Sequence, residues 1–178
     1  MKCYLGLTCK VGSYTQVLHE LAKLKIPQEN ITELLYCSID ILIQFGNLGS
    51  LNEFVEHWFN PIVKILEGDP LITETLSFIV ISSSPPLREE PYAYLFINTN
   101  PQNFASVREN LLLTPGILSA DTVFGPYDVI SAVQAKNGAE LDRLLTRIHR
   151  NIPGVKVSMT GVVKFRSSPS TTENGAAD

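Results

Sequence analysis

The order of predicted secondary-structure elements occurs twice along the chain, and this repetition restricts the fold more than any other feature. In each half, a strand and an amphipathic helix are followed by two short apolar strands, a second amphipathic helix and a long last strand. The two copies lie about ninety residues apart, a period too long for a solenoid unit and typical of a duplicated domain. Each half therefore has the order β-α-β-β-α-β, the ferredoxin-like arrangement with both helices on one face of an antiparallel sheet.

The other face of each sheet carries apolar side chains that must be covered, and the nearest cover is the sheet of the other copy. The sequence therefore predicts an α+β fold of the dimeric α/β-barrel type. Two ferredoxin-like repeats would pack sheet to sheet as an intrachain pseudo-dimer, in a sandwich or an open barrel.

Breaker residues set the domain boundaries. Residues 83–91 form the only internal segment with linker composition, so we expect a first repeat over 1–82 and a second over 92–166. Residues 167–178 are polar and lack periodicity, which predicts a disordered tail. Within the repeats, Ser13 is a candidate helix N-cap, Pro61 predicts a helix kink, and Asn137 with Glu140 resembles a capping box.

Composition excludes several classes of protein. The chain has 178 residues, of which 44% are hydrophobic and 18% charged, with a net charge of −4. Such an acidic chain lacks the Lys and Arg density that drives nonspecific nucleic-acid binding, and it has no polybasic cluster for an anionic membrane. No apolar run reaches the length of about 18 residues that a spanning helix needs, and no signal peptide is recognisable. We expect a cytoplasmic protein.

Cysteine and histidine positions give no support for metal binding or catalysis. Cys3, Cys9 and Cys37 fit no zinc spacing, so they are interpreted as reduced thiols. His19, His57 and His149 fall on three separate predicted helices without a paired carboxylate in register. No nucleophile motif or phosphate loop is present, so we expect neither an enzyme nor a bound cofactor or metal.

The second half carries an ordered set of motifs: Tyr94 to Thr99, Pro115-Gly116-Ile117, Gly125-Pro126-Tyr127-Asp128-Val129-Ile130, Leu141, Pro153-Gly154-Val155 and Thr160. Together, over roughly residues 92–165, they resemble the amino-acid-binding domain of the Lrp/AsnC, or feast/famine, regulators. The first half is similar to a degenerate copy, in which Asp40 stands at the position of Asp128, and Cys37 and Ile39 replace Gly125 and Tyr127.

The resemblance implies an effector-sensing module that forms oligomers. That family usually carries an N-terminal helix-turn-helix, whereas here the first strand starts within a few residues of Met1. We therefore expect no direct nucleic-acid or membrane contact. The expected partners are a small effector such as an amino acid, further copies of the chain, and a helix-turn-helix paralogue as one candidate.

The turn Gly125-Pro126-Tyr127-Asp128 is the candidate ligand site. Asp128 could accept hydrogen bonds from the ammonium group of a ligand, while the backbone N–H groups of the turn bind the carboxylate of that ligand. Alternatively, Asp128 only accepts hydrogen bonds from N–H groups of the turn itself. Tyr127 is either a pocket wall or a core aromatic. The resemblance places the ligand between dimers, near this turn and the last strand, which adds Ser158 and Thr160, with Asp40 as the equivalent residue of the first half.

Two alternatives to a sensor remain open: a small cofactor-free enzyme of the dimeric α/β-barrel type, and a purely structural oligomerisation module. An enzyme would need a cavity inside the fold. Arg143, Arg147 and Arg150 follow one another at helical spacing, either as a docking stripe for anions or as a solvated outer face.

Overall fold

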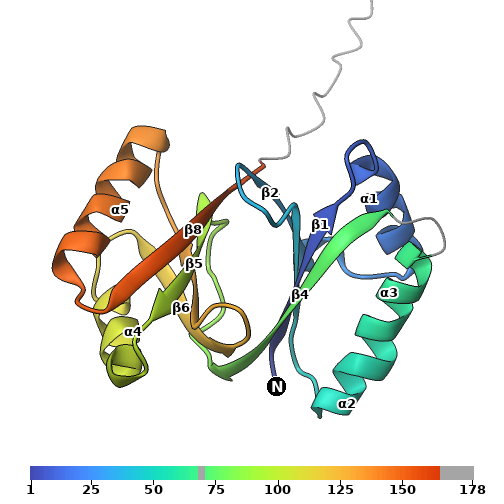
Figure 1. The fold of residues 1–178 in the computed structure, drawn as a ribbon, viewed down its shortest axis with the longest axis horizontal. Coiled ribbons are helices and arrows are strands. Elements are labelled where there is room, and N and C mark those ends of the chain that lie inside the picture. The colour runs from blue at the N-terminus through green and yellow to red at the C-terminus, as the bar shows by residue number, and fades with distance from the viewer. Residues whose placement is uncertain (68–70, 165–178) are drawn as a thin grey trace, which may run out of the picture.

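The computed structural model describes residues 1–67 and 71–164, with the backbone alone for 65–67 and 156–158. The elements follow the predicted order β-α-β-β-α-β in each half of the chain, here called the first and second unit (Figure 1). The first unit contains β1 (Cys3–Cys9), α1 (Tyr14–Lys23), a 3-10 turn (Gln28–Asn30), β2 (Ile31–Leu35), β3 (Ile41–Phe45), α2 (Leu51–Phe54), a π-helical turn (Val55–Phe59), α3 (Asn60–Glu67) and β4 (Ile72–Ser82). The second contains β5 (Ala93–Thr99), a 3-10 turn (Pro101–Asn103), α4 (Phe104–Leu112), β6 (Ile117–Phe124), β7 (Val129–Val133), α5 (Gly138–Asn151) and β8 (Val155–Val163).

The eight strands form one closed antiparallel barrel in the order β1-β3-β2-β8-β5-β7-β6-β4. Each unit contributes four neighbouring strands, β4-β1-β3-β2 and β8-β5-β7-β6, so the internal order is the same in both. The units join where β2 pairs with β8, through Leu34 and Val163, and where β4 pairs with β6, through Val80 and Val123. The mixed α+β prediction is confirmed, but the barrel is closed rather than open, because the edge strands of the two units pair with each other.

Alternation along the strands separates three apolar cores. Alternate residues of β1, such as Leu5 and Leu7, pack under α1, α2 and α3, while the equivalent residues of β5 pack under α4 and α5. The opposite faces of the strands meet inside the barrel. That interior cluster consists of Tyr4, Leu34, Ile39, Leu42, Phe78, Tyr94, Phe96, Val123, Ile130 and Ala132. Helices therefore lie on the two outer sides and the barrel between them, as Figure 1 shows.

The helix caps and the helix kink predicted from the sequence are confirmed only in part. The N-cap half of the predicted capping box is confirmed, since Asn137 Oδ1 accepts from the Glu140 N–H at 3.0 Å. Glu140 Oε2 accepts from the Lys136 N–H at 2.8 Å, one residue before the N-cap, so the reciprocal bond of a capping box is replaced by a neighbouring one. The irregularity expected at Pro61 takes the form of the π-helical turn directly before it, where the Asn60 N–H donates to Val55 O, five residues back.

Ser13 precedes α1, but the expected side-chain cap is absent. Its hydroxyl lies instead within hydrogen-bond distance of two acceptors, Lys10 O at 2.8 Å and Leu71 O, and so connects the helix start to the segment before β4. The segment 83–91 contains no helix or strand, and its assignment as a domain linker stays a prediction. The predicted tail 167–178 lies outside the described residues.

Candidate functional site

The turn of residues 125–128 joins β6 to β7, and Asp128 fixes it to the end of β5. Asp128 Oδ2 accepts from the Thr99 N–H at 2.8 Å. The Asp128 backbone N–H donates to Ile97 O, and its carbonyl accepts from the Val123 N–H, both at 2.9 Å. The half-buried carboxylate thus connects the turn to a neighbouring strand rather than to N–H groups of the turn itself.

Asp40 makes the equivalent contacts in the first unit. Its Oδ2 accepts from the Cys9 N–H at 2.7 Å. Its N–H donates to Leu7 O at 2.9 Å, and its carbonyl accepts from the Leu34 N–H at 2.8 Å. The two aspartates therefore occupy structurally equivalent positions, as the sequence alignment of the two halves predicted.

Each turn approaches the last strand of the other unit. A Cβ at Gly125 would lie 2.9 Å from Ser77 O and 2.8 Å from Phe78 Cδ1 on β4, so only glycine fits there. On the other side, a Cβ at Gly161 of β8 would lie 2.8 Å from Cys37 Sγ in the first unit's turn. Gly125 and Pro126 are otherwise exposed, so the turn is accessible from solvent.

Tyr127 makes the contacts of a core aromatic. Its ring centroid lies 5.6 Å from that of Phe96 and 6.3 Å from that of Phe78, and its hydroxyl donates to Met159 Sδ at 3.7 Å. In the first unit, Ile39 and Gly6 take the equivalent positions: a Cβ at Gly6 would lie 3.2 Å from two Ile39 side-chain carbons. The aromatic pair Tyr127 and Phe96 of the second unit therefore corresponds to the smaller pair Ile39 and Gly6 of the first.

The last strand places Ser158 and Thr160 differently. Ser158 pairs with Ile97, the residue whose carbonyl accepts from Asp128, although the Ser158 side chain lies outside the described residues. Met159 packs against the interior cluster, so alternation directs the neighbouring Thr160 toward the helices, away from Tyr127. The structure brings the Ser158 backbone near the Asp128 turn and separates Thr160 from Tyr127. Ligand binding by these residues stays a prediction.

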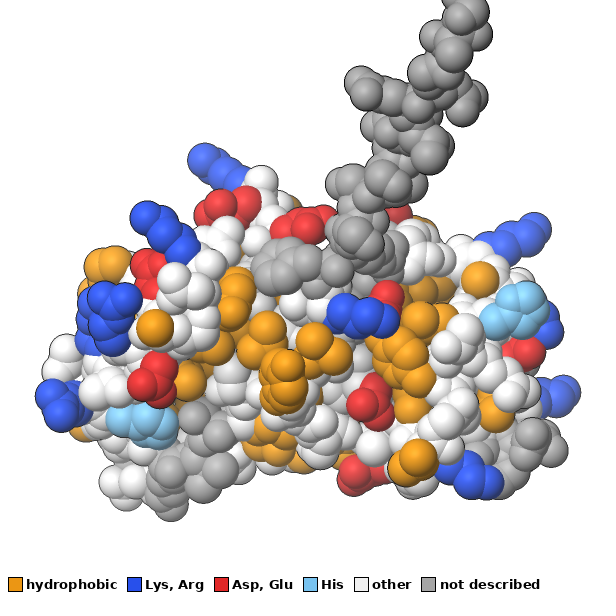
Figure 2. All heavy atoms as spheres, turned by 90° about the horizontal axis from the view of Figure 1, so that it is seen from above, with side chains coloured by type: hydrophobic (Ala, Val, Ile, Leu, Met, Phe, Trp, Pro, Cys, Tyr) orange, Lys and Arg blue, Asp and Glu red, His pale blue; other side chains and the backbone are white. Residues whose placement is uncertain are grey.

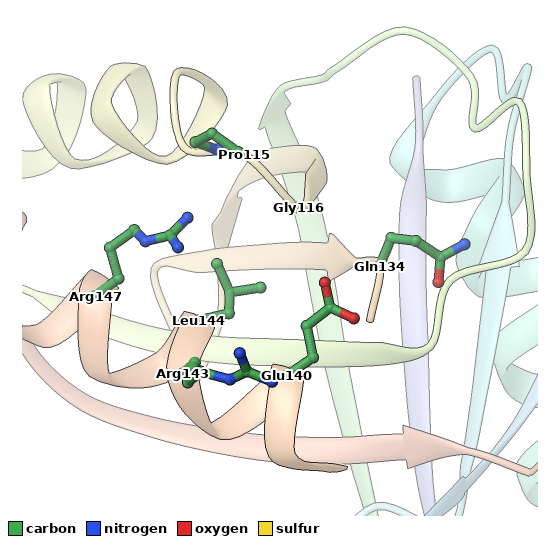
Figure 3. A pocket seen from close by; sticks show the side chains of 7 residues that line it. All are labelled: Pro115, Gly116, Gln134, Glu140, Arg143, Leu144 and Arg147. Atoms are coloured by element: carbon green, nitrogen blue, oxygen red, sulfur yellow. The ribbon is translucent and has the colours of Figure 1, made fainter. Parts of the chain in front are cut away.

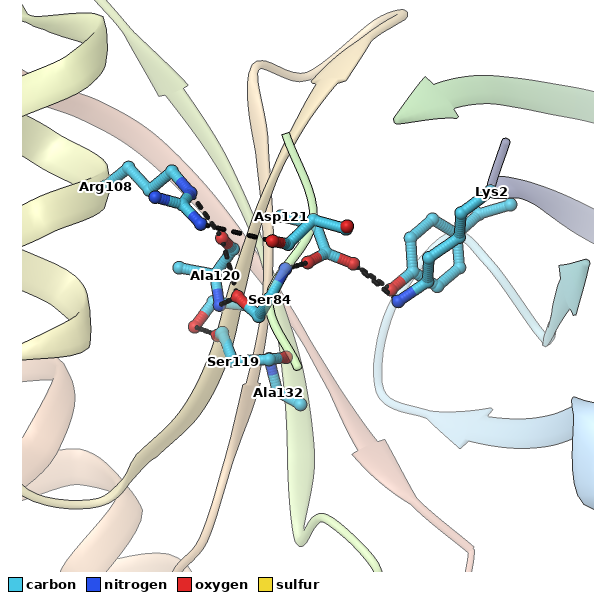
Figure 4. A network of polar contacts seen from close by, with 10 residues as sticks. Lys2, Ser84, Arg108, Ser119, Ala120, Asp121 and Ala132 are labelled. Carbon is cyan, nitrogen blue, oxygen red and sulfur yellow. Dashed lines mark hydrogen bonds and ion pairs between the residues drawn. The ribbon is translucent and has the colours of Figure 1, made fainter. Parts of the chain in front are cut away.

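A buried polar network in the barrel was not anticipated from the sequence (Figure 4). The side chain of Asp121 is 0% exposed. It accepts hydrogen bonds from Lys2 Nζ, the Tyr4 hydroxyl and the Ser84 N–H, each at 2.6 Å. Burial, and next the Asp121 carboxylate, raise the pKa of Tyr4 above its ordinary value. The one sequence signal is a charged residue in the middle of a predicted strand.

Tyr94, equivalent to Tyr4 by strand position, lies in the same interior cluster, and burial raises its pKa. The Leu34 and Val123 N–H groups make equivalent bonds to Asp40 and Asp128, so Thr32 of β2 stands at the position that Asp121 has in β6. The first unit therefore has a neutral residue where the second has the buried carboxylate.

A second polar cluster surrounds Asp40 in the first unit. The Tyr14 hydroxyl donates to Glu33 Oε2, and Lys164 Nζ pairs with the same oxygen at 2.9 Å. Burial, followed by the charge of Asp40, raises the pKa of the Cys9 thiol to about 12, so this cysteine stays protonated at neutral pH.

Two adjoining surface pockets lie beside α5 (Figure 3). The first has a volume of about 300 Å³ and is lined by Pro115, Gly116, Gln134, Glu140, Arg143, Leu144 and Arg147. The second has a volume of about 420 Å³ and is lined by Gly116, Gln134, Ala135, Lys136 and Glu140. Gly116 precedes β6 and Gln134 follows β7, so these pockets lie at the opposite end of the β6–β7 hairpin from the Asp128 turn.

The part of the chain that the structure describes contains no group of three or more His, Cys, Asp or Glu residues arranged to hold a metal ion. Within residues 1–67 and 71–164, no helix has the length and apolar character needed to cross a membrane.

Comparison with known proteins assigns part of the chain to a family. Residues 92–171 match the family model of the Lrp/AsnC ligand binding domain. Comparison with curated protein sequences gives no match.

Three solved structures illustrate the likeness. A protein of Thermus thermophilus is 27% identical, with a TM-score of 0.39, and the match covers 43% of this chain and 95% of that one. FFRP-DM1 is also 27% identical, with a TM-score of 0.38 and coverage of 41% and 96%. The siroheme decarboxylase NirDL, solved with an iron-uroporphyrin III analogue, has 8% identity, a TM-score of 0.65 and coverage of 93% and 71%, which is a likeness of fold alone.

The family match covers the second unit, including its Pro-Gly-Ile, Gly-Pro-Tyr-Asp and Pro-Gly-Val motifs. Residues 92–171 are therefore similar to the Lrp/AsnC ligand-binding domain.

Proposed function

We propose that this chain is a sensing and oligomerisation module for an amino acid or a related small metabolite, which acts through partner proteins rather than by binding DNA itself. The match of residues 92–171 to a ligand-binding domain carries the proposal. In this proposal the ligand binds one assembly state of the chain more tightly than another. This difference in affinity shifts the equilibrium between the two assembly states.

In this proposal the two units act as an intrachain pseudo-dimer. The strand order is the same in both units, and the units exchange equivalent edge pairings, β2 with β8 and β4 with β6. The turn contacts at Gly125 and Gly161 follow the same exchange, and Tyr4 of the first unit meets Asp121 of the second. A site at a unit–unit boundary is then asymmetric, because only one unit matches the family.

The Asp128 carboxylate can hold the turn and bind a ligand at the same time. One of its oxygens accepts from the Thr99 N–H. A carboxylate offers about four acceptor positions on its two oxygens, so capacity remains for a ligand ammonium. The exposed Gly125 and Pro126 leave the turn open to such a ligand.

Exposed apolar side chains beside both turns favour assembly with further copies. Tyr36 is 89% exposed next to Cys37, and Phe124 is 71% exposed next to Gly125. In Figure 2, hydrophobic side chains lie along the middle of the molecule, whereas Lys and Arg side chains lie mostly toward its two ends. Contacts made by these residues would place the Asp128 turn close to an interface between chains.

Partner-mediated output and a cytoplasmic location belong to the same proposal. The net charge of −4 disfavours direct binding to DNA phosphates, which Lys and Arg must neutralise. A helix-turn-helix paralogue that assembles with this chain is one candidate partner.

An enzyme of the dimeric α/β-barrel type is the less favoured reading. Its active site would need a cavity between the two sheets, and Ile39, Phe78 and Phe96 fill that space with 0% exposure. The two pockets described above lie outside the barrel. We therefore propose a non-enzymatic function, and a purely structural module remains as the competing outcome of the test below.

The test is a thermal-shift screen against each proteinogenic amino acid at millimolar concentration, with wild type, Asp128→Asn and the exposed control Asp142→Asn. Asparagine keeps an acceptor for the Thr99 N–H and removes the charge. A ligand at 100 times its dissociation constant raises the midpoint by about 5–10 °C for a chain of this size. We expect one or a few amino acids to do so in wild type and Asp142→Asn but not in Asp128→Asn. If no amino acid raised the thermal midpoint of wild type, the proposal would be contradicted.

A further inference from the structure

The pocket beside α5 is lined by two arginines that have no anionic partner among the described residues. Arg143 Nε donates to Ala139 O of its own helix at 3.2 Å, and no ion pair joins either Arg143 or Arg147 to a described carboxylate. One helical turn separates them, so both lie on the same face of α5 with Cβ atoms about 5–6 Å apart. Figure 3 shows both side chains along one side of the pocket.

The opposite wall is the Pro115-Gly116 turn. Gly116 has a φ of +97°, a conformation that residues with a side chain rarely adopt. A Cβ there would also lie 3.4 Å from both Gln134 O and a Leu144 methyl carbon. The glycine therefore brings backbone close to α5 and leaves the volume of about 300 Å³ between them, which is at the lower end of the range for small-molecule sites.

The electrostatics of the pocket favour an anion. Lys136 lines the adjoining pocket, and the positive end of the α5 dipole lies nearby at Gly138. Glu140 is the single acidic residue lining either pocket, and its Oε2 already accepts from the Lys136 N–H. An excess of positive charge thus gathers here, on a chain whose net charge is −4.

We propose that this pocket binds a small metabolite bearing two anionic groups, either phosphoryl or carboxylate. Guanidinium groups bind both kinds of oxygen anion in a bidentate way, and two of them one turn apart suit two such groups on a short spacer. The site is separate from the Asp128 turn, because the β6–β7 hairpin lies between them. The inference goes beyond the proposed amino-acid site and does not depend on it.

The experiment is isothermal titration calorimetry of the full chain at fixed ionic strength, with inorganic pyrophosphate and succinate as separate probes. Arg143→Gln, Arg147→Gln and Arg150→Gln each remove one positive charge from α5, but Arg150 does not line the pocket. We expect at least one probe to bind saturably. Affinity should fall about tenfold in each pocket variant, the loss typical of one charge-assisted hydrogen bond, and less than about twofold in Arg150→Gln.

The choice of probe distinguishes the two ligand classes: pyrophosphate binding indicates a phosphorylated ligand and succinate binding a dicarboxylate. Asp128→Asn should leave both titrations unchanged, so failure of the amino-acid site and failure of this one are separable. The absence of binding by both probes, or equal losses in all three arginine variants, would overturn the proposal.

Discussion

Asp40 and Asp128 occupy equivalent turns and make the same hydrogen bond, each accepting the N–H of the last residue of its unit's first strand, at 2.7 Å from Cys9 and 2.8 Å from Thr99. This bond satisfies a backbone donor at a strand end in both units. The aspartates therefore have a structural role that is independent of any ligand.

Replacing either aspartate by alanine should lower the free energy of unfolding by about 1–2 kcal/mol, because a partly buried N–H loses its acceptor. Asparagine keeps an acceptor, so Asp40→Asn and Asp128→Asn should cost less than half of that. Urea unfolding followed by circular dichroism measures both pairs. Equal losses for alanine and asparagine would show that charge, not the hydrogen bond, stabilises the turn.

The close approach at Gly125 predicts a second effect on stability. Gly125→Ala places a methyl group 2.9 Å from Ser77 O, a backbone atom that cannot rotate away, and should destabilise the protein by about 1–3 kcal/mol. Gly46→Ala is the control, since a Cβ there meets nothing within 4 Å. Thermal midpoints compare the two variants, and a neutral Gly125→Ala would mean that the turn and β4 lie farther apart.

Lys2 should be more important for stability than an ordinary surface lysine. Lys2→Met leaves the fully buried Asp121 with only the Tyr4 hydroxyl and the Ser84 N–H as donors, and should cost about 1–3 kcal/mol because a buried acceptor loses one of its three partners. Lys64→Met on the exposed side of α3 should change stability by less than about 0.5 kcal/mol. Denaturant midpoints for the two variants test this, and similar midpoints would show that the contacts around Asp121 do not stabilise the fold.

Stability should also fall in alkaline solution. Cys9 has a folded pKa of about 12, against an ordinary value of 9.0, so the folded state holds its proton more tightly than the unfolded chain does. Burial raises the pKa of Tyr4 in the same direction. The contribution of a raised pKa is complete below the unfolded value and is lost as pH rises toward the folded one. Thus the free energy of unfolding should decline above about pH 9.

Cys9→Ala isolates one part of that decline. Its stability should fall less steeply than that of wild type between about pH 9 and pH 10, where the unfolded thiol ionises before most of the unfolded tyrosines do. Denaturant titrations at closely spaced pH values provide the comparison. Parallel curves would show that the Cys9 thiol titrates alike in both states.

The element order could be predicted because each helix and strand has a strong local signal. The stripe from Leu141 to Ile152 and the Asn137–Glu140 pair define α5 without help from the rest of the fold. Ser13 shows the limit of such signals: its hydroxyl donates to Leu71 O, which is far away in sequence, and so does not cap α1. Barrel closure likewise depends on strand edges from different units, such as Leu34 with Val163.

The candidate site was predicted only in part for the same reason. The family-like motifs locate the Asp128 turn, and the equivalence of Asp40 follows from the repeat. No local pattern reveals that Asp121 meets Lys2, Tyr4 and Ser84, because these residues come together only in the closed barrel. The sequence showed Arg143 and Arg147 on one helix face, but the pocket also needs the distant Pro115-Gly116 turn.

The most direct test of the sensing account is equilibrium dialysis of the full chain against an equimolar mixture of the proteinogenic amino acids, followed by chromatographic analysis of what the protein retains. Wild type and Asp142→Asn should enrich one or a few amino acids, whereas Asp128→Asn, although folded, should enrich none. Equal enrichment by Asp128→Asn would place the site elsewhere, and no enrichment by wild type would contradict amino-acid sensing.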